Sequence, residues 1–258
     1  MGHAMPTRII CVANQKGGVG KTTTAVTMAH GLALSGRRTL LVDLDPQGHV
    51  AFSLGIPKAP GFYNLIVNEE PIEKVAVPTK RENLEIIPGD KHTEKAKRTI
   101  VISNFPTEII SRALKNAEYD IVILDLAPSL DVLHVSALMA SDWVLIPTKL
   151  DAMAVDGVNE VLRSMGEVVE RGHRLGYSIL PTFFDRTTKE TVVQFQALVE
   201  AFKERVWPPI PQDTKAREAP AYGKSLWEYC PQSAAVVGFD NQRTSGYISA
   251  LLRLMESL

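Results

Sequence analysis

One stretch near the amino end constrains this chain more than any other feature. Residues 16–23 read KGGVGKTT, directly after an apolar run at 9–13 and at the start of a segment of helix length. Glycines allow a tight turn in which successive N–H groups point inward, and such a nest at the amino end of a helix binds anions. The order of strand, glycine loop and helix therefore predicts a phosphate-binding loop.

The loop ends in residue types suited to a nucleoside triphosphate and magnesium. Lys21 is placed to reach β- and γ-phosphates, and Thr22 to put its hydroxyl on Mg²⁺. The pattern G-x-x-x-x-G-K-[ST] is not met, because Gln15 stands at its first glycine. A glycine-rich turn without a ligand would not explain the Gly-Lys-Thr ending. The residues predicted to bind nucleotide here are Lys16, Gly17, Gly18, Val19, Gly20, Lys21, Thr22 and Thr23.

Short β-branched apolar runs alternate with helix-length segments along most of the chain. Continuous apolar runs are typical of a parallel sheet that is covered on both faces. The sequence therefore predicts an α/β fold, a doubly wound, mostly parallel sheet flanked by helices, in one domain over 6–258. Prolines break the last third into loops and short helices. The predicted strands are 9–13, 39–43, 84–88, 119–124, 143–147 and 177–184, and the predicted helices are 21–35, a stretch around 92–116, 131–140, 154–171, 189–205 and 247–257.

Composition excludes several classes of protein. The 258 residues carry 28 Lys+Arg against 29 Asp+Glu, so a constitutively basic nucleic-acid coat protein is not expected. The apolar runs are shorter than the ~20 residues that span a bilayer. Two cysteines provide neither a disulfide framework nor a metal-ligand cluster, which favours a cytoplasmic protein. Residues 1–5 lack an apolar signal region and are interpreted as a cloning remnant followed by the native start at Met5.

Carboxylates follow two of the predicted strands. Asp43 and Asp45 come at the end of one strand, and Asp125 ends the apolar run Ile121-Val122-Ile123-Leu124. Carboxyl ends of parallel strands meet at one edge of the sheet, so these side chains are expected beside the phosphate loop. There they would organise Mg²⁺ through its water shell or hold a water for in-line attack. Capping of the strand end is the alternative, more so for Asp43.

The string KGGVGKTT resembles the deviant phosphate loop of the ParA/MinD group of P-loop ATPases, and VDLDPQG at 42–48 resembles the group's second motif. In that group the first lysine, here Lys16, reaches the nucleotide of the partner subunit in an ATP dimer. The resemblance implies catalytic roles for Lys16, Lys21 and Asp45, with Asp45 positioning water. It implies that Thr22, Asp43 and Asp125 hold Mg²⁺, the carboxylates through water. A solvated loop charge is the alternative for Lys16.

The segment after Asp125 departs from the family pattern. The family usually has D-x-P-P, whereas Leu126-Ala127-Pro128 follows Asp125 here, so that Ala127 replaces the first proline. The departure bears on the stiffness of the loop that senses the γ-phosphate and leaves the metal carboxylate intact.

The carboxyl-terminal region resembles ParA proper more than other branches. The residues Pro211, Gln212 and Asp213, with the Glu-Ala-Pro and Gly-Lys that follow, resemble the family's nucleotide-proximal loop and imply contact with the adenine. Iron-protein relatives need cysteines in a suitable loop, and these are missing. A MinD-like membrane helix needs several cations, whereas only Arg253 lies near the final apolar stripe of Ile248, Leu251, Leu252 and Met255. We therefore expect a core-facing terminal helix and no membrane contact.

A local cationic excess lies between Arg186 and Lys224, where seven cations stand against five acids. Such cations, doubled in a dimer, would bind DNA phosphates without sequence preference. Ordinary solvated side chains are nearly as good an interpretation for any one residue. The candidates for DNA binding are Arg186, Lys189, Lys215, Arg217 and Lys224, and a second cluster of Lys91, Lys95, Lys97 and Arg98 is interpreted rather as a solvated helix face.

Together these features predict a ParA-like ATPase that acts as a switch in plasmid or chromosome partition or in cargo positioning. ATP and Mg²⁺ would drive homodimerisation and non-specific binding to double-stranded DNA on the bacterial or archaeal nucleoid. A ParB-like partner would stimulate slow hydrolysis. The alternatives are an amidotransferase or ligase of the cobyrinic acid a,c-diamide synthase type, a MinD-like ATPase, and a binding module without hydrolysis. The first would be expected to carry a glutaminase domain, for which 258 residues leave little room.

Overall fold

The structure is a computed structural model that describes residues 6–103, 106–239 and 244–258. The predicted cloning remnant and the predicted native start at Met5, which together make up residues 1–5, lie outside the described residues. Six parallel strands form the sheet that carries the phosphate loop, and they match the six predicted runs with small shifts at their ends. These strands are β1 (Arg8–Val12), β2 (Thr39–Asp43), β4 (Leu84–Ile87), β5 (Ile121–Asp125), β6 (Trp143–Lys149) and β7 (Gly176–Thr182).

A seventh strand, β3 (Val77–Arg81), was not predicted from the sequence. It pairs antiparallel with β4 at the sheet edge, and the order in the described sheet is β3-β4-β2-β5-β1-β6-β7. Its sequence VPTKR is mostly polar and contains Pro78, which cannot donate a ladder hydrogen bond and so is found at sheet edges. The mostly parallel, doubly wound sheet is confirmed, with one antiparallel edge.

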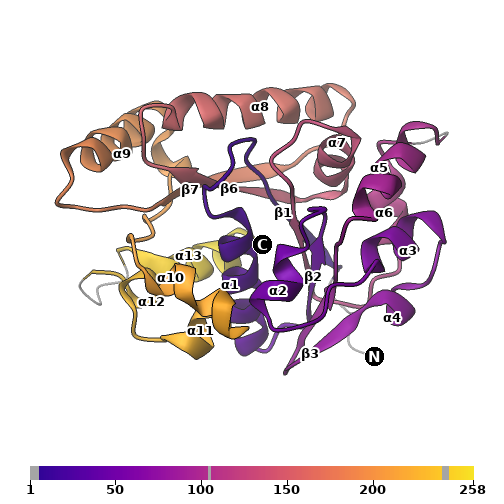
Figure 1. The fold of residues 1–258 in the computed structure, drawn as a ribbon. Helices are drawn as coiled ribbons and strands as arrows, with labels where there is room; N and C mark the ends of the chain where they lie inside the picture. Colours follow the sequence, from indigo (N-terminus) through magenta and orange to yellow (C-terminus); the bar gives the residue numbers. More distant parts are fainter. Residues whose placement is uncertain (1–5, 104–105, 240–243) are drawn as a thin grey trace.

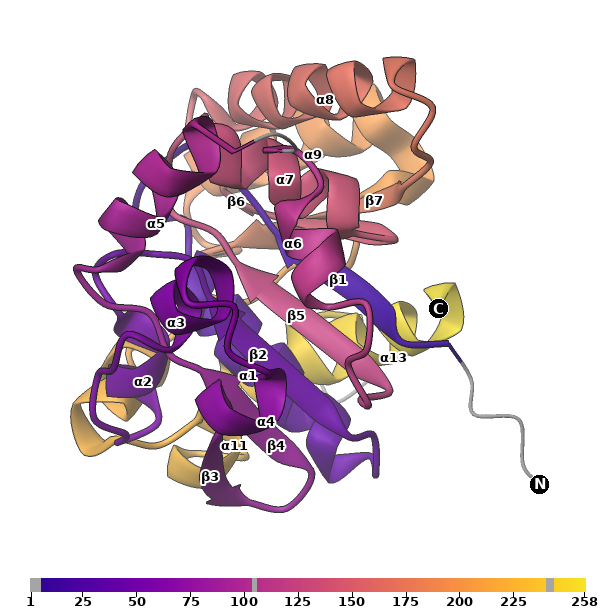
Figure 2. The same ribbon diagram turned by 90° about the vertical axis from the view of Figure 1, so that its right-hand side faces the viewer.

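Helices cover both faces of the sheet, and each face has its own apolar cluster. Figure 2 shows the sheet lying between the two layers. In α8, residues Val158, Val161, Met165 and Val168 follow helical spacing and are buried, as an amphipathic helix on a core requires. One layer contains α3 (Gly61–Val67), α4 (Ile72–Val75), α5 (Thr93–Val101), α6 (Ile109–Ala113), α7 (Val132–Ala140), α8 (Ala154–Glu170) and α9 (Lys189–Phe202); the other contains α1 (Lys21–Leu34), α2 (His49–Ser53), α10 (Lys215–Glu218), α11 (Leu226–Tyr229), α12 (Ala234–Val237) and α13 (Gly246–Ser257).

Some predicted helices differ from those in the structure. The stretch around 92–116 contains two separate helices, α5 and α6, and residues 104–105 between them lie outside the described part. The predicted helix 189–205 ends at Phe202 because Lys203 has a positive φ of 49°, after which a short 3₁₀ turn follows. The terminal helix α13 faces the core as expected. Its most deeply buried residues are Tyr247, Ala250 and Leu254, and Leu251, Ile248 and Met255 of the predicted stripe border the same core cluster.

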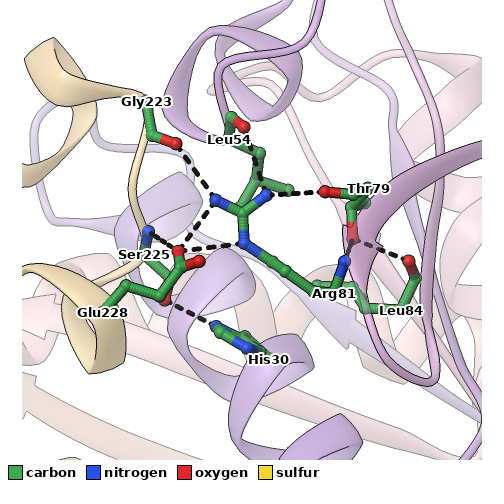
Figure 3. A network of polar contacts seen from close by, with 8 residues as sticks. All are labelled: His30, Leu54, Thr79, Arg81, Leu84, Gly223, Ser225 and Glu228. Carbon is green, nitrogen blue, oxygen red and sulfur yellow. Dashed lines mark hydrogen bonds and ion pairs between the residues drawn. The ribbon is translucent and has the colours of Figure 1, made fainter.

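A polar network joins distant parts of the chain at the β3 edge (Figure 3). The Arg81 guanidinium donates to Glu228 Oε2 from Nε at 2.9 Å and from Nη2 at 2.8 Å. It also donates to the backbone carbonyls of Leu54, Thr79 and Gly223. The Arg81 side chain is only 9% exposed, so this is a largely buried cation with its hydrogen bonds satisfied.

Figure 3 also shows how the network reaches α1 and α11. Glu228 accepts a hydrogen bond from the Ser225 N–H at 2.8 Å, which completes a capping box at the start of α11. The Ser225 hydroxyl lies 2.6 Å from Nδ1 of His30 on α1. The network therefore ties the phosphate-loop helix, the end of α2 and the segment after α10 to the edge of the sheet.

Candidate nucleotide site

The phosphate loop joins β1 to α1 at the carboxyl edge of the sheet, as predicted (Figure 1). Gly18 and Gly20 have φ values of 71° and 88°, a region that glycine enters without steric cost. In the described chain, no atom outside the glycine and its two chain neighbours lies within 4 Å of a Cβ built on Gly17 or Gly18, so the loop backbone faces open space on this side. The side chain of Lys21 folds back over the loop, and its Nζ donates to the Lys16 carbonyl at 2.9 Å.

Two residues that the sequence analysis did not single out hold the loop in place. Asn14 accepts a hydrogen bond from the Lys16 N–H at 2.9 Å and donates to the Pro147 carbonyl on β6 at 2.9 Å. Thr182, at the end of β7, donates to the Val19 carbonyl at 3.0 Å. The only available signal was position, since Thr182 ends β7 and Asn14 follows β1 by two residues. The loop is thus preorganised by its neighbouring strands before any ligand binds.

The predicted carboxylates gather beside this loop. Asp43 and Asp125 are register partners at the ends of β2 and β5, and both are fully buried. Asp43 accepts hydrogen bonds from the backbone N–H groups of Asp45 at 3.0 Å and Val50 at 3.1 Å. Burial raises the pKa of Asp43 to about 7 despite these hydrogen bonds. This carboxylate therefore also organises the turn into α2, as the capping interpretation predicts.

Asp125 is placed differently from Asp43. Neither of its carboxylate oxygens has a hydrogen-bond partner within the described ranges, although the side chain is fully buried. Burial and the nearby charge of Asp43 raise its pKa, while the Thr22 hydroxyl and the Lys21 ammonium act in the opposite direction. A buried carboxylate with unsatisfied oxygens is costly unless a cation or donor completes it.

These residues fit a hydrated magnesium ion with a triphosphate. Mg²⁺ usually keeps several waters and takes only one or two carboxylates from the protein, and the unsatisfied oxygens of Asp125 next to Thr22 suit that mode. Burial lowers the pKa of Lys21, with Asp125 and Asp45 opposing the shift. An anion at the loop would favour the charged form of this lysine further.

Lys16 does not lie free in the loop. Its Nζ contacts both carboxylate oxygens of Asp151 at 2.7 and 2.6 Å, and the two side chains are 35% and 26% exposed. Asp151 follows β6. Partial burial raises its pKa, but the hydrogen bonds from Lys16 and the Met153 N–H, together with the charges of Lys16 and Lys149, hold the pKa below its usual range. In this structure the first lysine of the motif is therefore engaged by a carboxylate of its own chain.

The predicted adenine segment lies near the phosphate loop but is used mainly for backbone structure. Pro211 pairs with Phe184 next to the end of β7, and the Gln212 N–H donates to the Phe184 carbonyl at 2.9 Å. Both carboxylate oxygens of Asp213 accept backbone N–H groups, one from Lys215 at 2.9 Å and one from Ala235 at 3.1 Å. The exposed Gln212 side chain is the one better placed to meet a ligand.

The predicted DNA-binding cations fall into two groups. Arg186, which follows β7, and Lys189, the first residue of α9, are exposed, and Arg186 lies over the Phe239 ring at 4.9 Å. Arg217 and Lys224 are exposed around α10, whereas Lys215 is paired with Glu218 at 2.8 Å. Both groups come from the side of the molecule that carries α9 and α10 in Figure 1.

The second basic cluster needs a correction at Lys97. Its side chain is only 13% exposed and its Nζ lies 2.7 Å from Asp131 and 3.4 Å from Glu94. Lys97 is therefore not part of a solvated helix face, whereas Lys91, Lys95 and Arg98 are exposed. The sequence did not reveal this pairing because the two partners belong to different elements.

A buried histidine stands close to the site. His134 on α7 is 2% exposed, its Nε2 has no hydrogen-bond partner in the described part of the chain, and burial lowers its pKa to about 4. Since the unfolded chain binds this proton near pH 6.5, stability should fall as pH decreases from about 6.5 to 4. Above that window the group contributes no pH dependence.

We expect His134→Leu to remove this pH dependence of the unfolding free energy, which amounts to on the order of 2–3 kcal/mol between pH 7 and 4. Urea unfolding of the variant and the wild type at several pH values measures it. The exposed His49, changed to Gln, serves as the control and should keep the wild-type slope. Parallel curves for His134→Leu and wild type would show that this histidine titrates normally.

Comparison with known proteins agrees with the geometry. A family model described as an AAA domain matches residues 7–175. The chromosome-partitioning ATPase Soj of Thermus thermophilus is 37% identical over 88% of this chain and 90% of its own length. The chromosome partitioning protein ParA of Myxococcus xanthus is 35% identical over 88% of this chain and 83% of its own.

Among solved structures, the chain resembles cobyrinic acid a,c-diamide synthase from Mycobacterium smegmatis with bound ATP analog and magnesium. The TM-score is 0.75 and the identity 31%, over 84% of this chain and 92% of that one. Among the described residues, no helix is both long and apolar enough to span a membrane.

Proposed function

This chain belongs to the ParA/MinD family of P-loop ATPases, and from this premise we propose that it is an ATP-driven dimerisation switch for partition or cargo positioning. One observation carries the proposal. A preorganised phosphate loop meets a buried carboxylate, Asp125, whose oxygens are unsatisfied in the described structure. That combination suits ATP with a metal ion better than it suits a free anion.

In this proposal, separate residues bind the phosphates, hold the metal ion and orient the attacking water. Lys21 and the loop N–H groups would bind the phosphates, and Thr22 and Asp125 would hold Mg²⁺ through its ligands and water shell. When bound, Mg²⁺ supplies neutralisation of charge on the phosphate oxygens. Asp45 is partly exposed beside the loop and would orient the attacking water. Asp43 supports the metal shell indirectly, since backbone N–H groups already occupy both of its oxygens.

Lys16 would act in the dimer. To reach the nucleotide of a partner subunit it must leave Asp151, so the free subunit and the ATP dimer would differ in this ion pair. ATP shifts the equilibrium only by its differential affinity for the two states, and the new contact of Lys16 would be part of that difference. The pair is partly exposed, which keeps the cost of breaking it low.

DNA binding would follow dimerisation. The formal net charge of the chain is −1, so one subunit is expected to bind DNA poorly. Two copies of the exposed cations Arg186, Lys189, Arg217 and Lys224 would give avidity. A ParB-like adaptor on the cargo would then stimulate hydrolysis and release the dimer from the nucleoid.

The test is binding to random-sequence duplex DNA with ATP or ADP over a salt series, alongside sedimentation to follow the oligomeric state. Tight, strongly salt-dependent binding by an ATP dimer and weak binding by the ADP form would support the switch. Equal affinity in both nucleotides would refute it. Removing Mg²⁺ with a chelator is expected to abolish the ATP effect.

Asp45→Ala should slow hydrolysis about tenfold or more while ATP still binds, because water loses its orienting carboxylate. The ATP dimer would then accumulate and stay on DNA. Single-turnover hydrolysis and the lifetime of the DNA complex measure the two effects. Turnover at the wild-type rate would remove Asp45 from the mechanism.

A second candidate is favoured by the 31% identity to the cobyrinic acid a,c-diamide synthase structure. In that case ATP would activate a carboxylate for amide formation. ATP turnover that requires ammonia or glutamine together with a carboxylate substrate, and that ignores DNA, would favour this candidate over the switch.

A further inference from the structure

The loop between β5 and α7 starts at the metal-site carboxylate. Leu126, directly after Asp125, is buried, and its N–H donates to the Val12 carbonyl on β1 at 3.3 Å. The Ser129 N–H donates to the Ala127 carbonyl at 2.9 Å and closes a tight turn around Pro128. Leu130, beyond the turn, is 61% exposed. The near end of this loop, residues 126–131, is thus fixed by the sheet and its middle faces solvent.

The far end of loop 126–131 is held by Asp131. One carboxylate oxygen accepts the N–H groups of Leu133 at 3.0 Å and His134 at 3.3 Å, which caps α7. The other accepts the Ser129 hydroxyl at 2.9 Å and lies 2.7 Å from the Lys97 ammonium. All four contacts converge on a single side chain, so the position of Asp131 decides where the loop ends.

Lys97 comes from another element, α5, and its surroundings favour the pair. Burial opposes the charge on each partner, yet the pKa of Lys97 is raised and that of Asp131 lowered by their mutual hydrogen bond and charge. With Lys97 13% and Asp131 29% exposed, the contact is better shielded than a surface ion pair.

The residue at position 127 makes the Lys97–Asp131 ion pair more important for the loop. Proline fixes φ and alanine does not. The backbone of loop 126–131 is therefore intrinsically less restricted with Ala127 than it would be with the two consecutive prolines of the D-x-P-P pattern. The loop therefore depends more on contacts made from outside it.

We propose that Lys97 is a positioning residue for ATP hydrolysis, which holds loop 126–131 against the nucleotide site through Asp131 and supplies by an ion pair the stiffness that Ala127 does not. The inference rests on the proposed ATPase function. Lys97 contacts neither nucleotide nor metal in this role, so it should affect the chemical step more than ATP binding.

The experiment compares three variants of the full chain. Lys97→Met keeps the aliphatic stem and removes the charge, and Lys97→Arg keeps the charge. Lys95→Met is the matched control, because Lys95 is exposed on the same helix. The readouts are kcat, ATP affinity, and hydrogen exchange of the amides of loop 126–131 with and without ATP.

Lys97→Met is expected to lower kcat about five- to tenfold, to change ATP affinity less than about twofold, and to speed exchange in the loop. Lys97→Arg should restore most of kcat, and Lys95→Met should match wild type. Unchanged loop exchange, or faster exchange with unchanged kcat, would overturn the proposal. Loss of ATP affinity in step with kcat would also overturn it, since that is the result of a general structural defect.

Failure of the proposed function would look different. A wild-type chain that does not hydrolyse ATP would refute the ATPase itself, and with it a role for Lys97 in hydrolysis. A wild-type chain that hydrolyses ATP normally, with no sensitivity to Lys97, would refute the positioning role alone.

Discussion

Replacing Lys21 by alanine is expected to lower kcat/KM for ATP hydrolysis by a factor of about a hundred to a thousand. Lys21 is buried, and its ammonium group lies over the backbone of the phosphate loop, where Nζ donates to the Lys16 carbonyl. Without it, the phosphate charge would be balanced only by N–H dipoles and metal. ATP affinity should fall as well, because the same charge acts in the ground state.

Measurements of Tm distinguish the loss of phosphate binding in Lys21→Ala from misfolding of the variant. Burial lowers the pKa of Lys21, so its charge is unfavourable in the absence of an anion, and Lys21→Ala should unfold at no lower temperature than wild type without nucleotide. Added ATP and Mg²⁺ should raise the Tm of wild type and leave the variant unchanged. The control is Lys115→Ala, at an exposed position away from the loop. A variant that still gains Tm from ATP would exclude Lys21 from phosphate binding.

The largest loss of stability is expected at Arg81. Changing it to methionine keeps apolar stem contacts but leaves three carbonyls without their donor and Glu228 without its cation. Removing one partner of a buried pair costs more than the pair itself contributes. Because the Glu228 side chain is 33% exposed, we expect a loss of about 3 kcal/mol and a Tm lowered by roughly 6–12 °C.

Two further variants identify the cause. Arg81→Met combined with Glu228→Gln should recover part of the loss, because the unpaired charge is gone. Arg8→Met removes a surface pair with Asp142, at 3.4 Å and with both side chains more than 40% exposed, and should cost less than about 1 kcal/mol. Thermal and urea unfolding measure all four proteins. Equal losses for Arg81→Met and Arg8→Met would contradict the assigned role of the network.

The positions of the phosphate loop and the carboxylates at one edge of the sheet have local causes. The phosphate loop, Asp43 and Asp125 each follow an apolar run, and parallel strands bring such ends to one edge. All five residues of β5, IVILD, are buried, and such a strand is recognisable in the sequence because burial requires a continuous apolar run. Strand β3 escaped prediction because an edge strand needs no apolar run.

The contacts that hold the site could not be predicted in the same way. Lys97 and Asp131 lie on separate helices, and Arg81 and Glu228 are 147 positions apart. Neither pair belongs to a motif, and a charged residue on a helix is most often solvated. Only the packing of α5 against α7 and of α11 near β3 turns these residues into partners. The chemical roles of all these site residues, and those of Asp45, Lys16 and the candidate DNA-binding cations, stay predictions.

If the chain is the proposed switch, the Lys16–Asp151 pair makes ionic strength act on its ATPase cycle in two opposite senses. Salt screens this partly exposed pair and would release Lys16 for a partner subunit, which speeds assembly. The same salt would compete with the proposed dimer for DNA phosphates and would speed its departure. The residence time of the proposed dimer on DNA would therefore be longest at an intermediate ionic strength and would shorten at both lower and higher salt concentrations.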